Sequence, residues 1–330
     1  MSNFIFTCGD VNGIGPEIVI KSIKKLYKTT NHKFIFITPQ NVFEEVSSNI
    51  KFKIPFSVVD NLPKKLTKRF YILKLNNIKI NYSKTTAASG LTSYNSIKKA
   101  FSLLKEKKAD AMITAPISKK AISLAGVKYP GHTEMLASWC KTKNFSMLFL
   151  SDKMKSSLVT IHTPINKIIK ELTVKKLLSS FEIIFNSLKN DFKIKDPKVA
   201  VLGLNPHSGE DGIIGDEEEK IIIPSIKKSK YSKYLFGPFS SDAFFAKHKY
   251  KEFDMIIGMY HDQVLIPFKL LNSGKGVNYT AGLPIIRTSP DHGTAFDIAG
   301  RFIADELSML EAFYFAEQIA KSRKRVNANL

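Results

Sequence analysis

The chain has 330 residues, of which 44% are hydrophobic and 24% are charged, and this length and composition are typical of a globular protein with two domains. The net charge is +21, and the 50 basic residues are 45 Lys and only 5 Arg. Because recognition of bases and phosphates favours Arg, we expect no nucleic-acid partner. The positive field should nevertheless attract anionic substrates. Two cysteines without a CxxC pair exclude a disulfide framework and a thiolate zinc site. The lack of a signal peptide or of a long uncharged apolar run predicts a cytoplasmic protein without membrane contact.

The first half of the chain predicts alternating strands and helices. An apolar strand at 4–8 leads into a loop with three glycines, and Pro16 with Glu17 opens a helix. The loop lacks GxGxxG spacing, so it can either bring the backbone close to a ligand or simply make a turn. The further expected elements are strands at 34–38, 56–59 and 111–114 and helices at 41–48 and 92–107. This alternation predicts an α/β fold with a mainly parallel sheet.

The second half continues the alternation. A helix is expected to open at His132 and Thr133, a strand pair at 146–150 and 157–161, and an amphipathic helix at 173–189. Apolar strands are expected at 199–204 and 255–259.

Three of these apolar strands each end at a histidine. His162, His207 and His261 follow the strands at 157–161, 199–204 and 255–259. Because parallel strands of one sheet place their carboxyl ends on one edge, these histidines can converge. Three imidazoles leave a coordination position open for a substrate, which is the pattern of a catalytic metal site, although His261 could instead be a satisfied core histidine.

Six motifs in chain order carry a resemblance to a known family. They are Gly9-Asp10 with Gly13-Ile14-Gly15-Pro16-Glu17, Thr114-Ala115-Pro116-Ile117-Ser118-Lys119, Gly131-His132-Thr133-Glu134, Asn205-Pro206-His207-Ser208-Gly209-Glu210, Tyr260-His261-Asp262-Gln263 and Asp291-His292-Gly293-Thr294-Ala295. Together they resemble the 4-hydroxythreonine-4-phosphate dehydrogenase family of pyridoxal phosphate biosynthesis, from residue 4 to about residue 301.

The resemblance implies the fold of the isocitrate and isopropylmalate dehydrogenases, with two α/β/α domains and an active cleft between them. The expected first domain is 1–130 plus 285–330 with dinucleotide-site elements, and the second is 131–284 with metal ligands and dimer contacts. It also implies a homodimer with the active site at the subunit interface.

The resemblance further implies NAD or NADP and one divalent metal, Zn, Co or Mg, per subunit. By position in the motifs, the metal ligands would be His162, His207 and His261. The substrate contacts would be His132, Thr133, Lys269, Asn278 and Arg287, and the dinucleotide site would include His292, Gly293, Thr294 and Asp297. Lys269, Asp242 and His132 are the candidates for catalytic groups.

The implied reaction is metal-assisted oxidation of 4-phosphooxy-L-threonine to 2-amino-3-oxo-4-phosphooxybutanoate, which decarboxylates to 3-amino-2-oxopropyl phosphate. A metal on the hydroxyl oxygen would lower its pKa, and Arg287, Lys269, Asn278 and the helix start at His132 and Thr133 suit a phosphate dianion. A paralogous dehydrogenase of D-threonate or D-erythronate 4-phosphate is the alternative, and an acyl transferase of the same fold is a further one.

Several assignments have structural alternatives. Asp242 is either a metal ligand or base, or a helix N-cap. His292 and Asp297 either line the dinucleotide site or form a pair at a helix start. Arg287 and Lys269 could be surface charges. The sequence also departs from the family pattern at Cys8, Val11, Asn12, Val264 and 279–281, and we expect Asn12 and Val264 to reshape the pocket.

Overall fold

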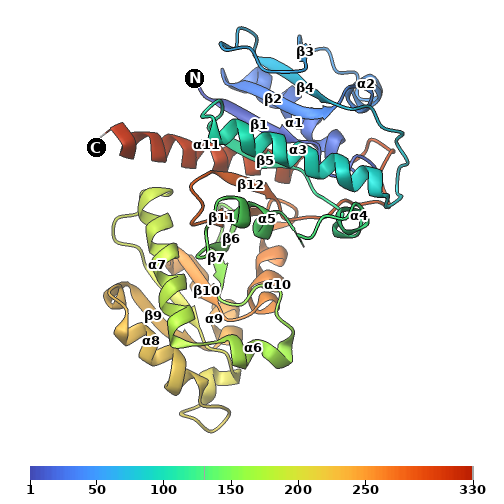
Figure 1. The fold of residues 1–330 in the computed structure, drawn as a ribbon. Helices are drawn as coiled ribbons and strands as arrows, with labels where there is room; N and C mark the ends of the chain where they lie inside the picture. The colour runs from blue at the N-terminus through green and yellow to red at the C-terminus, as the bar shows by residue number, and fades with distance from the viewer. Residues whose placement is uncertain (130, 329–330) are drawn as a thin grey trace. The chain divides into compact units, whose positions relative to one another are not determined.

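The computed structural model describes residues 1–129 and 131–328, with only the backbone of 325–328, and the chain divides into two compact units (Figure 1). Unit 1 contains Met1–Lys141 and Pro284–Ala320, and unit 2 contains Thr142–Leu283 and Lys321–Leu330. This division places His132 and Thr133 in unit 1, whereas the sequence analysis assigned them to the second domain.

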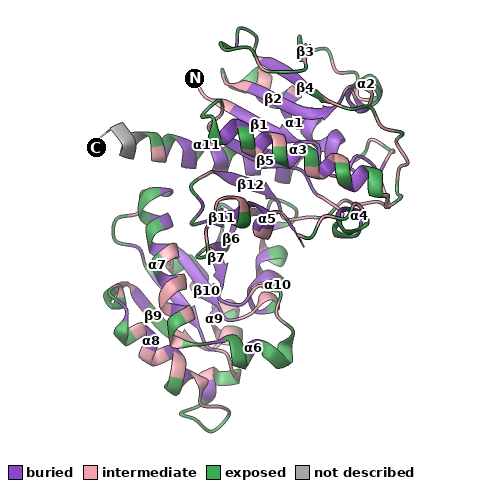
Figure 2. Cartoon of the chain, in the orientation of Figure 1, coloured by how far each residue is buried: buried purple, intermediate pink, exposed green. Residues whose placement is uncertain are grey.

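Unit 1 is built on a parallel sheet. Its strands are β1 (Asn3–Thr7), β2 (Lys33–Pro39), β3 (Ser57–Val59), β4 (Phe70–Leu75), β5 (Ala111–Thr114) and β12 (Arg287–Pro290). Their order is β3-β4-β2-β1-β5-β12, and every pairing is parallel. The central strands are buried along nearly their whole length because helices cover the sheet, as the continuous apolar runs predict (Figure 2).

The helices of unit 1 are α1 (Gly15–Thr29), α2 (Gln40–Asn49), α3 (Ala87–Lys105), α4 (Lys119–Leu124), α5 (His132–Trp139) and α11 (Leu307–Ala328), whose last residues belong to unit 2. α1 begins with Pro16 and Glu17, as predicted. Phe313 of α11 packs against Phe4 and Phe34 of the sheet, with ring centroids 4.8 and 5.9 Å apart. These aromatic contacts fix α11 on the strands.

Unit 2 has a mixed sheet. Its strands are β6 (Ser146–Leu150), β7 (Lys155–Leu158), β8 (Val199–Leu202), β9 (Leu235–Phe239), β10 (Met255–Gly258) and β11 (Val277–Ala281). Their order is β11-β6-β7-β10-β8-β9, with antiparallel pairing at β11-β6 and β6-β7 and parallel pairing elsewhere. The α/β class and the mainly parallel sheets that the sequence predicts are thereby confirmed.

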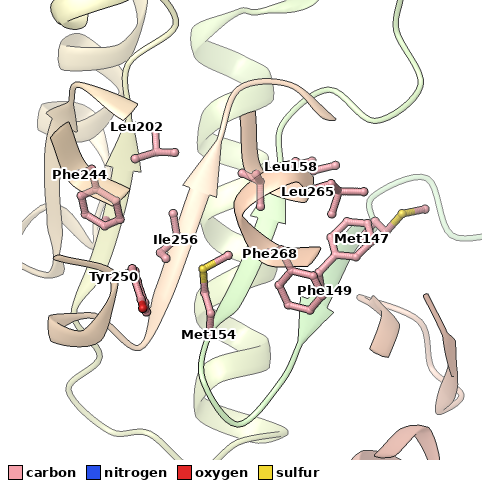
Figure 3. Packing of buried hydrophobic residues seen from close by; sticks show 12 residues of the cluster. Met147, Phe149, Met154, Leu158, Leu202, Phe244, Tyr250, Ile256, Leu265 and Phe268 are labelled. Carbon is pink, nitrogen blue, oxygen red and sulfur yellow. The ribbon is translucent and has the colours of Figure 1, made fainter. Parts of the chain in front are cut away.

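The helices of unit 2 are α6 (Ile165–Glu171), α7 (Val174–Asn190), α8 (Ile223–Lys228), α9 (Ser241–Ala246) and α10 (His261–Asn272). A buried cluster joins α10 to the strands, and Figure 3 shows Phe268 of α10 beside Phe149 of β6, with ring centroids 5.9 Å apart. This packing anchors the helix that begins at His261. Across the two described ranges, no helix combines the length and the hydropathy that a membrane span requires.

A buried ion pair fixes the end of α11 in unit 2. Arg323 Nε donates to Asp191 Oδ1 at 2.7 Å, and Arg323 Nη2 donates to the Tyr279 hydroxyl at 2.8 Å. The same hydroxyl donates to Asp191 Oδ2 at 2.6 Å. The Asp191 side chain is only 4% exposed, so its charge depends on these partners.

We expect Arg323→Met to destabilise unit 2 by about 3 kcal/mol, because it leaves a buried carboxylate without its cation. Urea denaturation followed by circular dichroism measures this loss. Arg301→Met, at an exposed arginine, is the matched control and should cost less than about 0.5 kcal/mol. Equal stability of the two variants would show that the Arg323 pair contributes nothing.

Candidate functional site

The carboxyl edge of the unit 2 sheet places three histidines after neighbouring strands. β10 lies between β7 and β8, and both pairings are parallel, so three segments leave the sheet at the same edge. His162 follows β7, His261 follows β10 and His207 follows β8. Ligands of open α/β sheets bind at this edge.

His162 and His261 lie close together. Their ring centroids are 6.1 Å apart, and the ring planes are inclined by 38°. His261 is the first residue of α10, and its Nδ1 is 2.7 Å from Asp262 Oδ1. Since an ionised carboxylate only accepts hydrogen bonds, His261 donates through Nδ1–H and keeps the lone pair of Nε2. A carboxylate that orients an imidazole in this way is typical of metal-binding histidines.

His207 lies in a strained turn after β8. His207, Ser208, Glu210 and Asp211 have φ angles of 52°, 54°, 44° and 53°. A left-handed backbone costs non-glycine residues on the order of 1–3 kcal/mol each, so the surrounding structure must hold this turn. Such clusters occur mostly at ligand and catalytic sites.

Asp242 lies near this turn, at the start of α9. Its pKa is below the ordinary value because the Ser240 hydroxyl and the Ala243 backbone N–H donate to its carboxylate and, more weakly, because His207 is near. The N-cap of α9 is Ser240, so the N-cap alternative for Asp242 is wrong. Asp242 is therefore an exposed, ionised carboxylate in the neighbourhood of His207.

Gln263 connects three segments at the same edge. Its Nε2 donates to Gly203 O at 2.5 Å and to Ser241 Oγ at 2.8 Å, and its Oε1 accepts from Met259 N at 2.6 Å. An amide suits this position because it offers donors and an acceptor together. The side chain thus ties the segments after β8 and β10 to the start of α9.

The histidines fit a divalent transition metal in their donor chemistry, because imidazole nitrogen is a preferred ligand of zinc and cobalt. His162 and His261 are already neighbours. Within the parts of the chain that the structure describes, no three His, Cys, Asp or Glu side chains form a closed metal-binding group. Metal binding would therefore require the His207 turn to complete the donor set.

A second polar cluster lies in unit 1. Arg287, at the start of β12, is only 3% exposed, and its Nε donates to Thr114 Oγ1 at 2.9 Å. Burial lowers the pKa of Arg287 to about 9, and Glu134 partly opposes this shift. The surface-charge alternative for Arg287 is therefore wrong.

His132 shares this environment. Burial and, to a smaller extent, the Arg287 charge lower the pKa of His132 well below its ordinary value. Its Nε2 is buried and has no hydrogen-bond partner among the described residues. Thr133 follows in the first turn of α5 and is also buried. A buried cation, an unpartnered nitrogen and a helix start are together suited to an anion such as phosphate.

Lys269 and Asn278, the other two residues expected to contact the substrate, both belong to unit 2. Lys269 is exposed on α10, after His261 on the same helix. Asn278 is half-buried in β11.

The segment expected to line the dinucleotide site follows β12 in unit 1. Residues 291–300 form bends, irregular chain and a turn but no helix, so the helix-start alternative for His292 and Asp297 is wrong. His292 Nδ1 is 3.0 Å from Gly293 O, and both Gly293 and Asp297 are exposed.

This segment rests on the glycine loop after β1. Ile14 N donates to Thr294 O at 3.0 Å, and a Cβ on Gly13 would lie 2.7 Å from the same oxygen. Gly13 therefore permits a close backbone approach, which is more than a simple turn requires.

Asn12 organises the loop from inside. It is completely buried, its Nδ2 donates to Lys84 O at 2.8 Å, and its Oδ1 accepts from Asn81 N at 2.9 Å. From sequence, Asn12 is a departure from the family pattern that is expected to reshape the pocket, and nothing in the sequence predicts its contacts with 81–84. A short amide bonding across to a distant loop has no local sequence signal.

Val264 does not reshape a pocket, contrary to expectation. It is completely buried in the core cluster of unit 2. A Cβ added to Gly258 would lie only 2.2 Å from Val264 Cγ2. Val264 therefore fills the space left by Gly258 and faces the core.

Comparisons with known proteins agree with this arrangement. Residues 28–316 match the family model described as "Pyridoxal phosphate biosynthetic protein PdxA". The chain is 37% identical over 325 residues to a 4-hydroxythreonine-4-phosphate dehydrogenase of Sulfurihydrogenibium sp. (strain YO3AOP1), covering 98% of this chain and 100% of the relative. It is also 37% identical over 326 residues to an Oceanobacillus iheyensis protein named as a proposed D-threonate 4-phosphate dehydrogenase, covering 96% and 97%.

Solved structures give the same result. A 4-hydroxythreonine-4-phosphate dehydrogenase from Klebsiella pneumoniae has a TM-score of 0.85 and 32% identity, covering 97% of this chain and 98% of that one. Isocitrate dehydrogenase from Methylococcus capsulatus, with a TM-score of 0.53 and 13% identity over 99% of this chain and 89% of that one, shares the fold.

We expect His132 to make the protein acid-sensitive. Its pKa is lowered in the folded state, so between that value and about 6.5 the unfolded chain binds the proton and the folded chain does not. The stability of the wild type relative to His132→Asn should therefore fall as pH falls below about 6.5, by at most about 1.4 kcal/mol per unit. Thermal unfolding in phosphate-free buffer measures this, and a constant difference across pH 7.5 to 5 would contradict it.

Proposed function

The chain belongs to the PdxA family of pyridoxal phosphate biosynthetic proteins and is a dehydrogenase, and from this premise we propose that its substrate is 4-phosphooxy-L-threonine. Oxidation of the hydroxyl by NAD or NADP would give 2-amino-3-oxo-4-phosphooxybutanoate. This β-keto acid would lose carbon dioxide to give 3-amino-2-oxopropyl phosphate.

One observation carries the proposal: the cluster of the buried Arg287 and the half-buried His132, with its buried Nε2 atom, in unit 1. Arg287 is a guanidinium that is only 3% exposed and can donate to an anion, and the Nε2 atom of His132 has no hydrogen-bond partner among the residues described. A phosphate oxygen would accept from Arg287 and, if His132 is the Nε2–H tautomer, from His132 as well. The phosphate end of the substrate would thereby be fixed and oriented.

His162, His207 and His261 would hold the divalent metal, zinc, cobalt or magnesium, which when bound lowers the pKa of the substrate hydroxyl and polarises the carbonyl that forms. The segment from His292 to Asp297 would hold the nicotinamide dinucleotide, which accepts the hydride. Gly13 supports that segment, because the lack of a side chain lets the Thr294 carbonyl oxygen approach its backbone.

Asp242 and Lys269 are the side chains that would transfer protons. Asp242, an exposed carboxylate near His207, is the candidate for the base that accepts the hydroxyl proton. Lys269, exposed on α10, is the candidate for the group that returns a proton to the carbon left by carbon dioxide. His132, held neutral by burial, contributes a hydrogen bond rather than a charge.

A second candidate is the oxidation of D-threonate or D-erythronate 4-phosphate. The Oceanobacillus iheyensis relative, named for D-threonate 4-phosphate, is as similar in identity, at 37%, as the Sulfurihydrogenibium protein. The two candidates share the phosphate and the hydroxyl and differ in an amine or a hydroxyl at position 2.

We also propose a homodimer in which the partner contributes to the active site, since the family resemblance implies one. Multi-angle light scattering of the purified chain would detect twice the mass of 37.1 kDa.

We expect NADH or NADPH formation to be faster with 4-phosphooxy-L-threonine than with D-threonate or D-erythronate 4-phosphate, at equal concentrations and with zinc, cobalt or magnesium. Cofactor absorbance measures the rate. Arg287→Lys should raise KM for every phosphorylated substrate, because Lys cannot form the bidentate hydrogen bonds to phosphate that Arg can form. Faster turnover of a sugar acid would replace the first candidate by the second.

We expect His207→Asn to lose cobalt binding and to lower kcat by at least about 100-fold, because an amide replaces a metal-binding imidazole. Asn tolerates the left-handed backbone at φ 52°, so the turn itself should survive. The matched control is His248→Asn, at an exposed histidine with φ 54°. Cobalt titration and turnover are measured for both, and unchanged cobalt affinity in His207→Asn would remove His207 from the metal site.

A further inference from the structure

The strained turn that carries His207 is wrapped around a buried carboxylate. Glu218 begins the π-helical turn Glu218–Ile222 and is only 2% exposed. Its Oε1 accepts from Leu204 N at 2.6 Å and from Asn205 N at 2.8 Å, and its Oε2 accepts from Asn205 Nδ2 at 2.9 Å. These three donors all belong to the two residues that lead from β8 into the turn.

Glycines on both sides let the turn close on this carboxylate. A Cβ on Gly203 would lie 2.9 Å from Glu218 Oε1, and a Cβ on Gly209 would lie 2.8 Å from Glu218 Oε2. His207 lies between these glycines, and Gly203 O is also held by Gln263. The Glu218 carboxylate therefore accepts hydrogen bonds from Leu204 and Asn205 at the start of the turn, and Gln263 donates to Gly203 just before them.

Local stability alone does not explain this arrangement. Burying a carboxylate is costly unless hydrogen bonds satisfy it, and here the bonds serve a left-handed run of residues that is itself costly. The cost is understandable if the turn must present His207 in one orientation.

We propose that Glu218 is a positioning residue that holds His207 ready for the metal, acting through Leu204 and Asn205. This inference rests on the proposed function, because it requires His207 to be a metal ligand. Glu218 itself stays inside the turn and contacts no reacting atom. Without its hydrogen bonds the turn would lose the form in which it presents His207 at the edge of the sheet.

The test is Glu218→Gln, which keeps size and shape but removes the charge and places an amide group against Asn205 Nδ2 or the backbone N–H groups. Cobalt affinity of the full, metal-free chain should fall by about 10–100-fold, the usual effect of losing a group that supports a metal ligand. The visible spectrum of bound cobalt should also change, since it reports ligand number and geometry. Glu219→Gln, the same substitution at the exposed neighbouring residue, should leave both unchanged.

A second variant covers the case in which Glu218→Gln does not fold. Asn205→Ser removes the side-chain bonds to Glu217 and Glu218 and keeps both backbone bonds to Glu218, so a smaller loss of cobalt affinity is expected. If either folded variant melts earlier but binds cobalt with wild-type affinity and spectrum, Glu218 is structural only and the inference is overturned. If the wild-type chain itself binds no cobalt, the proposed function fails instead.

Discussion

Parallel pairing of β7, β10 and β8 is the constraint on which the chemistry of unit 2 depends. Ile256 and Ile257 pair with β7 on one side and with β8 on the other, all in the same direction. A parallel strand cannot return by a tight turn, so each of the three segments must continue beyond the same edge before it turns back. The three segments that carry the histidines therefore leave the sheet at one edge because of backbone hydrogen bonding that involves none of the histidines.

Buried polar side chains then give the loops at these edges a definite form. In unit 2 Gln263 and Glu218 have all their hydrogen-bonding atoms engaged by backbone or side-chain partners, and in unit 1 Asn12 is similarly engaged. His132 is the contrast, because its buried Nε2 lacks a partner among the described residues. Satisfied groups make a loop rigid, whereas an unsatisfied buried group can take a hydrogen bond from a ligand.

Continuous apolar runs are predictable from sequence because such runs can be buried on both faces of a sheet, but distant contacts decide where elements end. The helix expected at 92–107 begins at Ala87, because Thr86 caps it. Gly90 is normally unfavourable in a helix, but here any larger residue would place its Cβ only 2.0 Å from Ala121 O. The strand expected at 157–161 is Lys155–Leu158, since pairing with β6 and β10 sets its bounds. The site histidines follow apolar runs and are recognisable, whereas Glu218 sits in an acidic stretch that looks like solvated surface.

The way the chain is divided between the two units bears on how it folds during synthesis. Unit 1 lacks β12 until Pro290 has left the ribosome, and Asp191 of unit 2 lacks its cation until Arg323 has followed. Neither unit can complete its core while most of the chain is being made, so both close late and through contacts between distant residues, which slows folding. Until then β5 is an open sheet edge, and an open edge can pair with other nascent chains. Assistance from a chaperone would matter most in that interval.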